Sequence, residues 1–87
     1  MSIIQTGLFA IVERFPHHKA AVRRLFKEND SFRTLCEDYG RCAAALRHWN
    51  QSVAEEAVAR RQEYAVLLQD LAAEILETLT RKNKRAL

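Results

Sequence analysis

Residues that interrupt regular structure are scarce in this 87-residue chain, which contains one proline and two glycines. Because proline and glycine often end helices and strands, their scarcity predicts long helices joined by few turns. The length leaves room for one small domain and excludes the doubly wound sheets and barrels of many enzymes. A monomer of this size is marginally stable, since ordering each residue costs about 1.5 kcal/mol.

Cysteine is also rare, and long apolar runs are missing. Cys36 and Cys42 are six residues apart, which turns their side chains about 120° from each other on a helix and disfavours a disulfide within one chain. We predict that Cys42 is a small core residue and that Cys36 flanks the core, where oxidation would pair it with a second copy. The apolar N-terminus lacks the basic start of a secretory signal and is too short to span a membrane. A reduced, cytoplasmic setting without a membrane span is therefore predicted.

Opposite charges are nearly balanced, with 14 Lys and Arg against 11 Asp and Glu, but they are unevenly distributed. Residues 13–29 hold five basic and two acidic residues, and the last seven residues hold four basic ones. Residues 52–80 hold six acidic and two basic residues. The chain is therefore expected to have separate basic and acidic regions that attract oppositely charged partners.

The first predicted helix is short and basic. Pro16 suits the first position of a helix, where its missing N–H is not needed, so this helix is expected over residues 16–28. Its apolar residues fall on one face and its basic residues on the other, which makes it amphipathic. Asn29 or Asp30 can cap a second helix over residues 30–50.

Apolar seams indicate how the longer helices pack. In residues 30–50 the apolar residues alternate spacings of three and four, the pattern of a helix that packs lengthwise against a partner helix. A second seam predicts a third helix over residues 53–82. The seam residues, expected to form helix-packing or oligomer contacts, are Phe32, Leu35, Tyr39, Cys42, Leu46 and Trp49, with Val53 ending the first seam, and Tyr64, Leu68, Leu71, Ile75 and Leu79 in the second.

The two seams differ in register, which predicts a turn at residues 50–52. Ser52 and Glu55 have the spacing of a capping box, in which each side chain accepts from a free N–H at the start of the helix. A continuous helix in a parallel dimer is the open alternative. The predicted fold is all-α, with a short N-terminal amphipathic helix followed by an antiparallel, coiled-coil-like two-helix hairpin.

A single helical domain is predicted over residues 15–82. The basic residues 83–87 are expected to fray at its end. For residues 1–14 the pattern leaves three alternatives open, namely a further helical segment, an arm swapped with a second copy, or disorder.

Three groups of residues form a pattern along the chain. They are Phe15-Pro16 ahead of the short helix, then Asn29, Phe32, Leu35 and Tyr39, and finally Leu68-Gln69-Asp70 and Ile75-Leu76. Taken together, these residues resemble the YdcH-like family of small bacterial proteins of unknown function. The resemblance covers about residues 14–79 and implies a short helix followed by a two-helix hairpin, with no activity, substrate or catalytic residue. The chain departs from the family at Cys42-Ala43, where relatives tend to carry Leu-Asp.

No motif indicates an enzyme or a metal site. His17 and His18 point about 100° apart on a helix, and the predicted hairpin puts His48 more than about 30 Å from them, so no metal site is expected. The two glycines stand apart from each other, which excludes a glycine-rich phosphate loop. No serine or cysteine lies in a pattern that orients it against a base. We therefore predict a non-enzymatic protein without cofactors.

The predicted function is a helical interaction or structural module that associates with itself as a dimer or larger bundle, because one hairpin leaves its seams incompletely buried. An unidentified protein is a further expected partner. The alternative is weak nucleic-acid binding by a basic pole, formed if the hairpin returns the C-terminus to the first helix. The residues of that pole, expected to contact a polyanion or an acidic partner, are Lys19, Arg23, Arg24, Lys27, Arg81, Lys82, Lys84 and Arg85.

Overall fold

The structure, a computed structural model, describes the backbone of residues 3–85 and the side chains of residues 7–81. Within these residues the chain forms helices joined by short loops and contains no strand, as the all-α prediction requires. The described elements are four α-helices and a short 3-10 turn, where the sequence predicted three helices, and the additional one lies in residues 1–14. In chain order they are α1 (Ile3–Arg14), η1 (Pro16–His18), α2 (Lys19–Glu28), α3 (Asp30–Asn50) and α4 (Ala57–Arg85).

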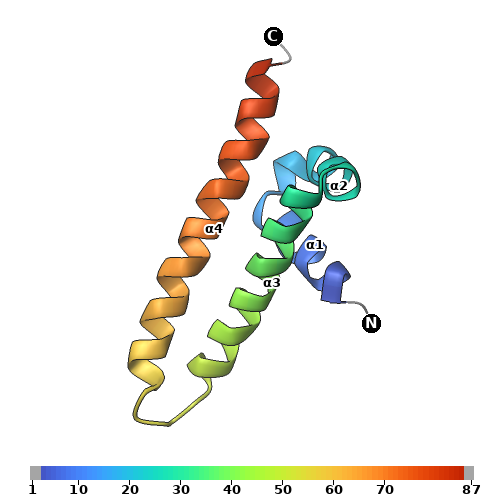
Figure 1. Ribbon diagram of the computed structural model, residues 1–87. Helices are drawn as coiled ribbons and strands as arrows, with labels where there is room; N and C mark the ends of the chain where they lie inside the picture. The colour runs from blue at the N-terminus through green and yellow to red at the C-terminus, as the bar shows by residue number, and fades with distance from the viewer. Residues whose placement is uncertain (1–2, 86–87) are drawn as a thin grey trace.

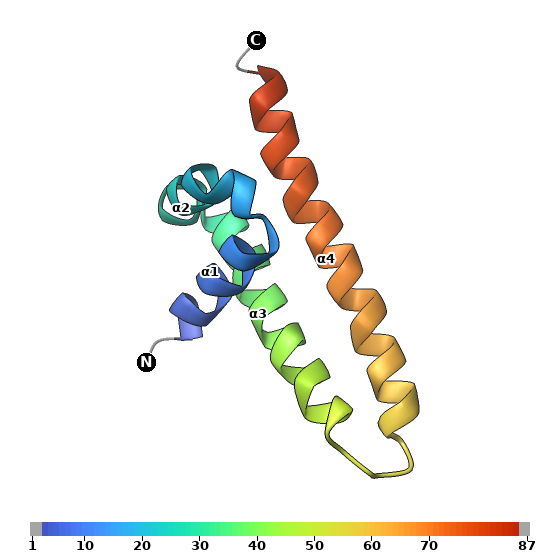
Figure 2. The same cartoon turned by 180° about the vertical axis from the view of Figure 1, so that it is seen from behind.

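The two long helices, α3 and α4, lie side by side and run in opposite directions (Figure 1). Helix α1 crosses α3 on one side of this pair, behind α3 in Figure 1 and in front of it in the rear view of Figure 2. Helix α2 packs against α3 and α1 near the beginning of α3. The molecule is elongated, with dimensions of 50 × 28 × 21 Å.

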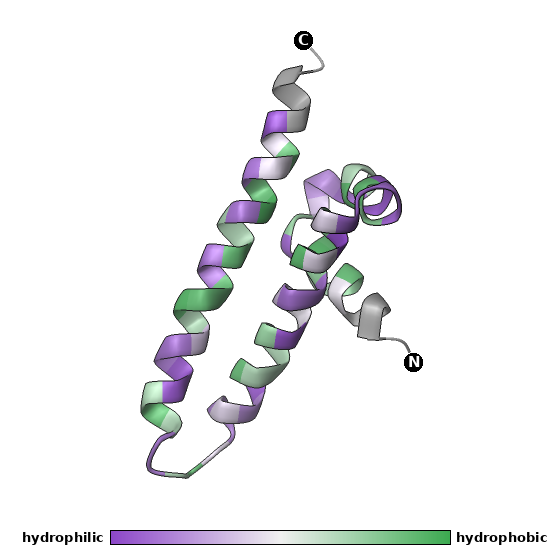
Figure 3. Cartoon of the chain, viewed as in Figure 1, coloured by the Kyte–Doolittle hydropathy of each residue, from purple (hydrophilic) through white to green (hydrophobic). Residues whose placement is uncertain are grey.

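Apolar residues recur along α3 and α4 between hydrophilic ones, as packing along one face requires (Figure 3). The core is concentrated in the half of the molecule that holds α1 and α2, because there four helices contribute side chains. The largest completely buried side chains in the described residues are Phe32, Ile11, Ile75, Leu79, Val22 and Cys36.

Gly7 allows α1 to approach α3 closely. A Cβ atom at this position would lie 2.6 Å from the carbonyl oxygen of Cys36 and 3.0 Å from the Cα of Glu37. Both are backbone atoms that cannot rotate away, so only glycine fits without a shift of the helices. This contact lets Ile11 of α1 reach complete burial in the core.

The start of the short basic helix differs slightly from the prediction. Pro16 begins the 3-10 turn η1, and the α-helical conformation starts at Lys19. At the other end, Asn29 rather than Asp30 caps α3, since its side-chain oxygen accepts a 3.0 Å hydrogen bond from the backbone N–H of Phe32.

The loop between α3 and α4 differs from the predicted turn, in which Ser52 and Glu55 formed a capping box. Helix α4 begins at Ala57, four residues later than expected, and residues 51–56 form the loop that crosses from one helix to the other. The Ser52 hydroxyl accepts from the N–H of Ala54 at 3.1 Å, closing a local turn within that loop. Val53, predicted to end the first seam, is fully exposed there. The alternative of one continuous helix is wrong for the same reason.

The end of α3 is instead fixed from the opposite helix. The carbonyl oxygen of Trp49 in the last turn of α3 accepts a 3.2 Å hydrogen bond from the backbone N–H of Ser52 and a second one, also of 3.2 Å, from the Arg61 guanidinium of α4. At the far end of the chain, α4 includes residues 83–85 of the predicted basic tail. Residues 86–87 of that tail lie outside the described residues.

Candidate interaction surfaces

A basic groove lies between α1 and α2. It has a volume of about 500 Å³ and is lined by Leu8 of α1 and by Arg23, Arg24, Phe26, Lys27 and Glu28 of α2. Leu8 and Phe26 are its apolar residues, while Arg23, Arg24 and Lys27 are exposed at its rim. The groove therefore combines apolar residues with three cations and the carboxylate of Glu28, and its net positive charge suits an anionic partner that also carries an apolar group.

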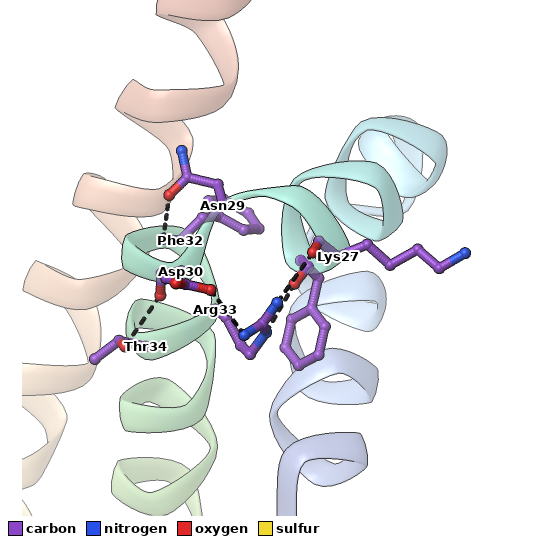
Figure 4. A network of polar contacts seen from close by, with 7 residues as sticks. Lys27, Asn29, Asp30, Phe32, Arg33 and Thr34 are labelled. Carbon is purple, nitrogen blue, oxygen red and sulfur yellow. Dashed lines mark hydrogen bonds and ion pairs between the residues drawn. The ribbon is translucent and has the colours of Figure 1, made fainter.

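Arg33 of α3 anchors the helix that carries these cations (Figure 4). Its guanidinium donates to the carbonyl oxygens of Phe26 at 2.9 Å and Lys27 at 3.0 Å, which lie in the last turn of α2. The same group forms a 2.9 Å ion pair with Asp30 and lies 5.8 Å from the centre of the Phe26 ring. These bonds satisfy terminal carbonyls and fix the direction of α2 relative to α3.

The four basic residues of α2 remain available to a partner. Lys19, Arg23, Arg24 and Lys27 are all exposed, and none forms an ion pair with another described residue. Ion pairs within residues 7–81 occur elsewhere, in Arg33–Asp30, Arg41–Asp38, Arg60–Glu63 and Arg81–Glu77.

The predicted basic pole is only partly described. Figures 1 and 2 both place α2 in the half of the molecule that holds the C-terminal end of α4. Arg81 is exposed there, but it forms a 2.6 Å ion pair with Glu77 on its own helix, so its charge is partly neutralised. The side chains of Lys82, Lys84 and Arg85 lie outside the described residues.

An apolar groove of about 320 Å³ lies between α3 and α4 on the surface of the helix pair. Its lining residues belong to these two helices alone, and the ion pair between Asp38 and Arg41 lies at its edge. Leu67 is 46 % exposed on the α4 side. The Cys42 thiol, on the α3 side, donates a 3.4 Å hydrogen bond to the carbonyl oxygen of Tyr64. The remaining lining residues are Ala45 and Leu71.

A smaller groove of about 240 Å³ is present where α1 ends. Arg14 of α1 lines it together with residues of both long helices. The third helix therefore contributes to this groove, whereas no described residue of α1 or α2 lines the groove at Cys42. The other residues here are Tyr39, Leu46, Ala65, Leu68 and Gln69.

The seam residues divide into two groups according to their position along the molecule. Near α1 and α2 they are buried apart from Leu35, and toward the loop most are only half-buried. The buried ones are Phe32, Tyr39, Cys42, Ile75 and Leu79, and the half-buried ones are Leu35, Leu46, Trp49, Tyr64, Leu68 and Leu71.

The structure corrects the prediction for Cys36. This residue has no exposed surface, because α1 crosses α3 there at Gly7, so it cannot pair with a second copy while the protein is folded. Burial, and secondarily the charge of Glu37, raises the pKa of the Cys36 thiol to about 12. Burial also raises the pKa of Cys42. Both thiols are free and, with raised pKa values, unreactive at neutral pH.

Sequence reasoning missed two features of these surfaces. It did not find the contact of Arg33 with the end of α2, since only the tertiary angle between α2 and α3 brings that guanidinium to those carbonyls. It also did not find that Leu8 lines a groove together with α2, because a helix was one of three alternatives left open for residues 1–14. The basic face of α2, in contrast, followed directly from its helical spacing.

Neither histidines nor acidic residues gather into a metal site in the part of the chain that the structure describes. His17 and His48 are exposed, and His18 is half-buried. None of the described helices is long and apolar enough to cross a membrane. No family model, curated protein or solved structure matches the chain.

Proposed function

We propose that the protein is a non-enzymatic helical interaction module that binds a second copy of itself through the uncovered face of α3 and α4. The observation that carries this proposal is the groove at Cys42 and Leu67, whose lining comes from the two long helices alone. On the opposite side of the pair, α1 crosses α3 and reaches complete burial with Ile11. The uncovered face is the surface on which a further pair of helices can pack.

The accessible surface supports a partner of this size. The chain exposes 6276 Å², whereas a compact monomeric protein of 10.1 kDa exposes about 5,300 Å². The difference, about 1,000 Å², is close to the roughly 800 Å² that each partner buries in a stable protein–protein interface. The elongated molecule therefore has enough surplus surface for one such interface.

Two-fold symmetry suits this face because each copy then offers the same groove to the other. Two antiparallel pairs packed face to face form a four-helix bundle, in which Leu67 and Leu71 enter the shared core. The edge of the face carries charges of both signs, with Asp38–Arg41 on α3 and Arg60–Glu63 on α4. Such edges favour one orientation of the copies over others.

The test is light scattering coupled to size-exclusion chromatography, with reductant present, at low and high salt. We expect a dimer at both salt concentrations, since burial of apolar surface does not weaken with salt. Leu67→Glu should give a monomer, because it places a charge in the apolar interface. Val58→Glu is the matched control, because Val58 is 64 % exposed and lies outside the groove.

Two outcomes would contradict the proposal. A wild-type protein that stays monomeric at the highest concentration reached would show that the face has no second copy as its partner. A Leu67→Glu protein that remains a folded dimer would show that the copies meet elsewhere, and circular dichroism establishes that this variant is folded.

The cellular setting and the family relationship that we propose are those predicted from the sequence. A reducing, cytoplasmic environment agrees with two free, buried thiols. Membership of the YdcH-like family stays a prediction that rests on the residues quoted above. It supports a hairpin-based interaction module without adding an activity.

A further inference from the structure

The cations of the α1–α2 groove have no anionic partner in their own described structure, and α4 carries carboxylates that have none either. We infer that the α1–α2 groove binds the acidic face of α4 of another copy, joining dimers into larger assemblies. This inference rests on the proposed function as a self-associating module and adds a second, electrostatic contact to it. The acidic face borders the apolar groove at Leu67, because Leu67 lies four residues after Glu63 and three residues before Asp70 on α4.

The acidic face of α4 is defined by helical spacing. Glu63, Asp70 and Glu77 recur every seven residues, and Glu74 lies four residues after Asp70, so all four fall within a narrow arc. All are exposed, on the side of α4 away from the buried Ile75. Glu63 and Glu77 pair with arginines of their own helix.

Asp70 and Glu74 therefore form the part of this face that is open to a partner, since neither has an ion pair among the described residues. On α2, Arg23 and Lys27 are likewise four residues apart. A four-residue step advances about 6 Å along a helix axis. The two cations and the two carboxylates thus have matching spacing, and two helices laid lengthwise can form both ion pairs at once.

An apolar side chain beside the carboxylates matches the interior of the groove. Val66 precedes Asp70 by one helical turn and is 57 % exposed, although most valines in helical proteins are covered. The groove offers Leu8 and Phe26 beside its cations. Docking of the acidic face would cover Val66 and pair the charges in one contact.

This combination favours an acidic helix over a nucleic acid. A phosphate backbone would use the cations of the groove but not its apolar interior, and phosphate binding is typically accompanied by further contacts along a basic surface. Arg33 beside the groove is already engaged with Asp30 and the end of α2, so among the described cations of α2 only Lys19 would extend the basic surface. Nucleic acid is therefore the competing occupant that the experiment must exclude.

The contact has to form between different molecules. In both Figure 1 and Figure 2, α2 and α4 lie on opposite sides of the beginning of α3, and the acidic residues of α4 are on its exposed side, so we expect the groove and the acidic face to meet between copies. Because the two surfaces are different, the contact is head-to-tail, and repeated contacts of this kind give rings or open chains. Ion pairs at exposed surfaces are screened by salt, so these assemblies should dissolve at high salt.

Sedimentation velocity on the full chain, at low and high salt with reductant, tests the inference. We expect species larger than a dimer at low salt, and only the dimer at high salt. Arg23→Glu should abolish the larger species and leave the dimer intact. Arg47→Glu is the matched control, because it makes the same charge change at an exposed position of α3 outside the groove.

Charge exchange identifies the occupant of the groove. Glu74→Lys alone should also abolish the larger species, and Arg23→Glu combined with Glu74→Lys in one chain should restore them. A mixture of the two single variants should also form larger species, since the groove of each variant is compatible with α4 of the other variant. A general change in net charge would not explain larger species that return at low salt and dissociate again at high salt.

Three experimental results would each contradict a contact proposed for this protein. If the dimer persists at high salt but no larger species forms at low salt, the further inference is wrong and the proposed function stands. If larger species form at low salt but dissolve to monomers, the apolar dimer is wrong and the electrostatic contact stands. If a fluorescein-labelled oligonucleotide binds in an Arg23-dependent manner and no larger species form, nucleic acid occupies the groove and the inference is overturned.

Discussion

Replacing Gly7 by alanine should destabilise the protein, although alanine is the better helix former. In an ordinary helix this change stabilises by up to about 1 kcal/mol, because glycine has greater freedom in the unfolded chain. Here the new Cβ would lie 2.6 Å from the carbonyl oxygen and 2.9 Å from the carbonyl carbon of Cys36. The sign of the effect therefore shows whether α1 packs on α3 in this way.

The magnitude follows from the displacement that the new atom requires. Ordinary contact needs at least 3.4 Å, so α1 must move away from α3 by several tenths of an ångström. Forcing an extra methyl group into such a contact costs about 1–3 kcal/mol, and part of the packing of Ile11 is lost with it. After subtraction of the propensity gain, we expect a net loss of about 1 kcal/mol for Gly7→Ala and a larger loss for Gly7→Leu.

Urea unfolding followed by circular dichroism measures this difference, with protein concentration held fixed because association shifts the apparent stability. Ala44→Gly, at an exposed position of α3, calibrates the propensity term and should cost about 1 kcal/mol. A Gly7→Ala protein that is more stable than the wild type would refute the close crossing of α1 and α3. The burial of Cys36 by α1 would then have to be abandoned as well.

Three further predictions concern the corner between α2 and α3 and the buried thiol. Arg33→Met should lower the free energy of unfolding by about 1–2 kcal/mol, because two carbonyls at the end of α2 lose a charged donor, whereas Arg81→Met, at an exposed ion pair outside the dimer groove, should change it by less than about 1 kcal/mol in urea unfolding. Asn29→Ala should cost about 1 kcal/mol in the same assay through loss of the cap on Phe32, and Asn29→Asp should retain most of the stability. The raised pKa of Cys36 means that the unfolded chain releases the thiol proton first. The stabilisation from this group is therefore complete below about pH 9 and declines as pH rises toward 12, by at most about 1.4 kcal/mol per pH unit. Cys36→Ala should have a shallower decline over this range, and equal slopes for both proteins would contradict the burial of the thiol.

The apolar seams could be predicted from the sequence because they depend only on helical periodicity. Phe32, Tyr39 and Cys42 are buried along α3, and Ile75 and Leu79 along α4. Each of these positions faces a neighbouring helix whichever way the rest of the chain is arranged. The basic face of α2 was predictable for the same reason.

Burial that depends on a third element could not be predicted. Cys36 is outside the regular seam, and its neighbours in sequence give no sign that a further helix crosses there. The crossing requires a glycine at position 7 of α1, and a single glycine in an apolar segment does not indicate which helix it approaches. The sequence pattern therefore predicted an accessible thiol where the structure has a covered one.

The turn between α3 and α4 shows a different limit. Ser52 and Glu55 match a capping box, but the same serine spacing also suits a local turn in which the hydroxyl accepts from the N–H two residues later. The separation of the two helix axes decides between them, since the chain must cross that distance before α4 can begin. The loop through residue 56 supplies this length, and Val53 is left in solvent as a result.

The same periodicity that predicts a seam is silent about which chain covers it. Tyr64 and Leu71 belong to one regular seam with Ile75 and Leu79, yet the first two are half-buried and the last two are covered. The difference arises because α1 and α2 reach only one end of the α3–α4 pair and lie on one side of it. A seam that its own chain covers along only half its length has the same sequence pattern as a seam that is covered completely. We expect a second copy to cover the exposed half.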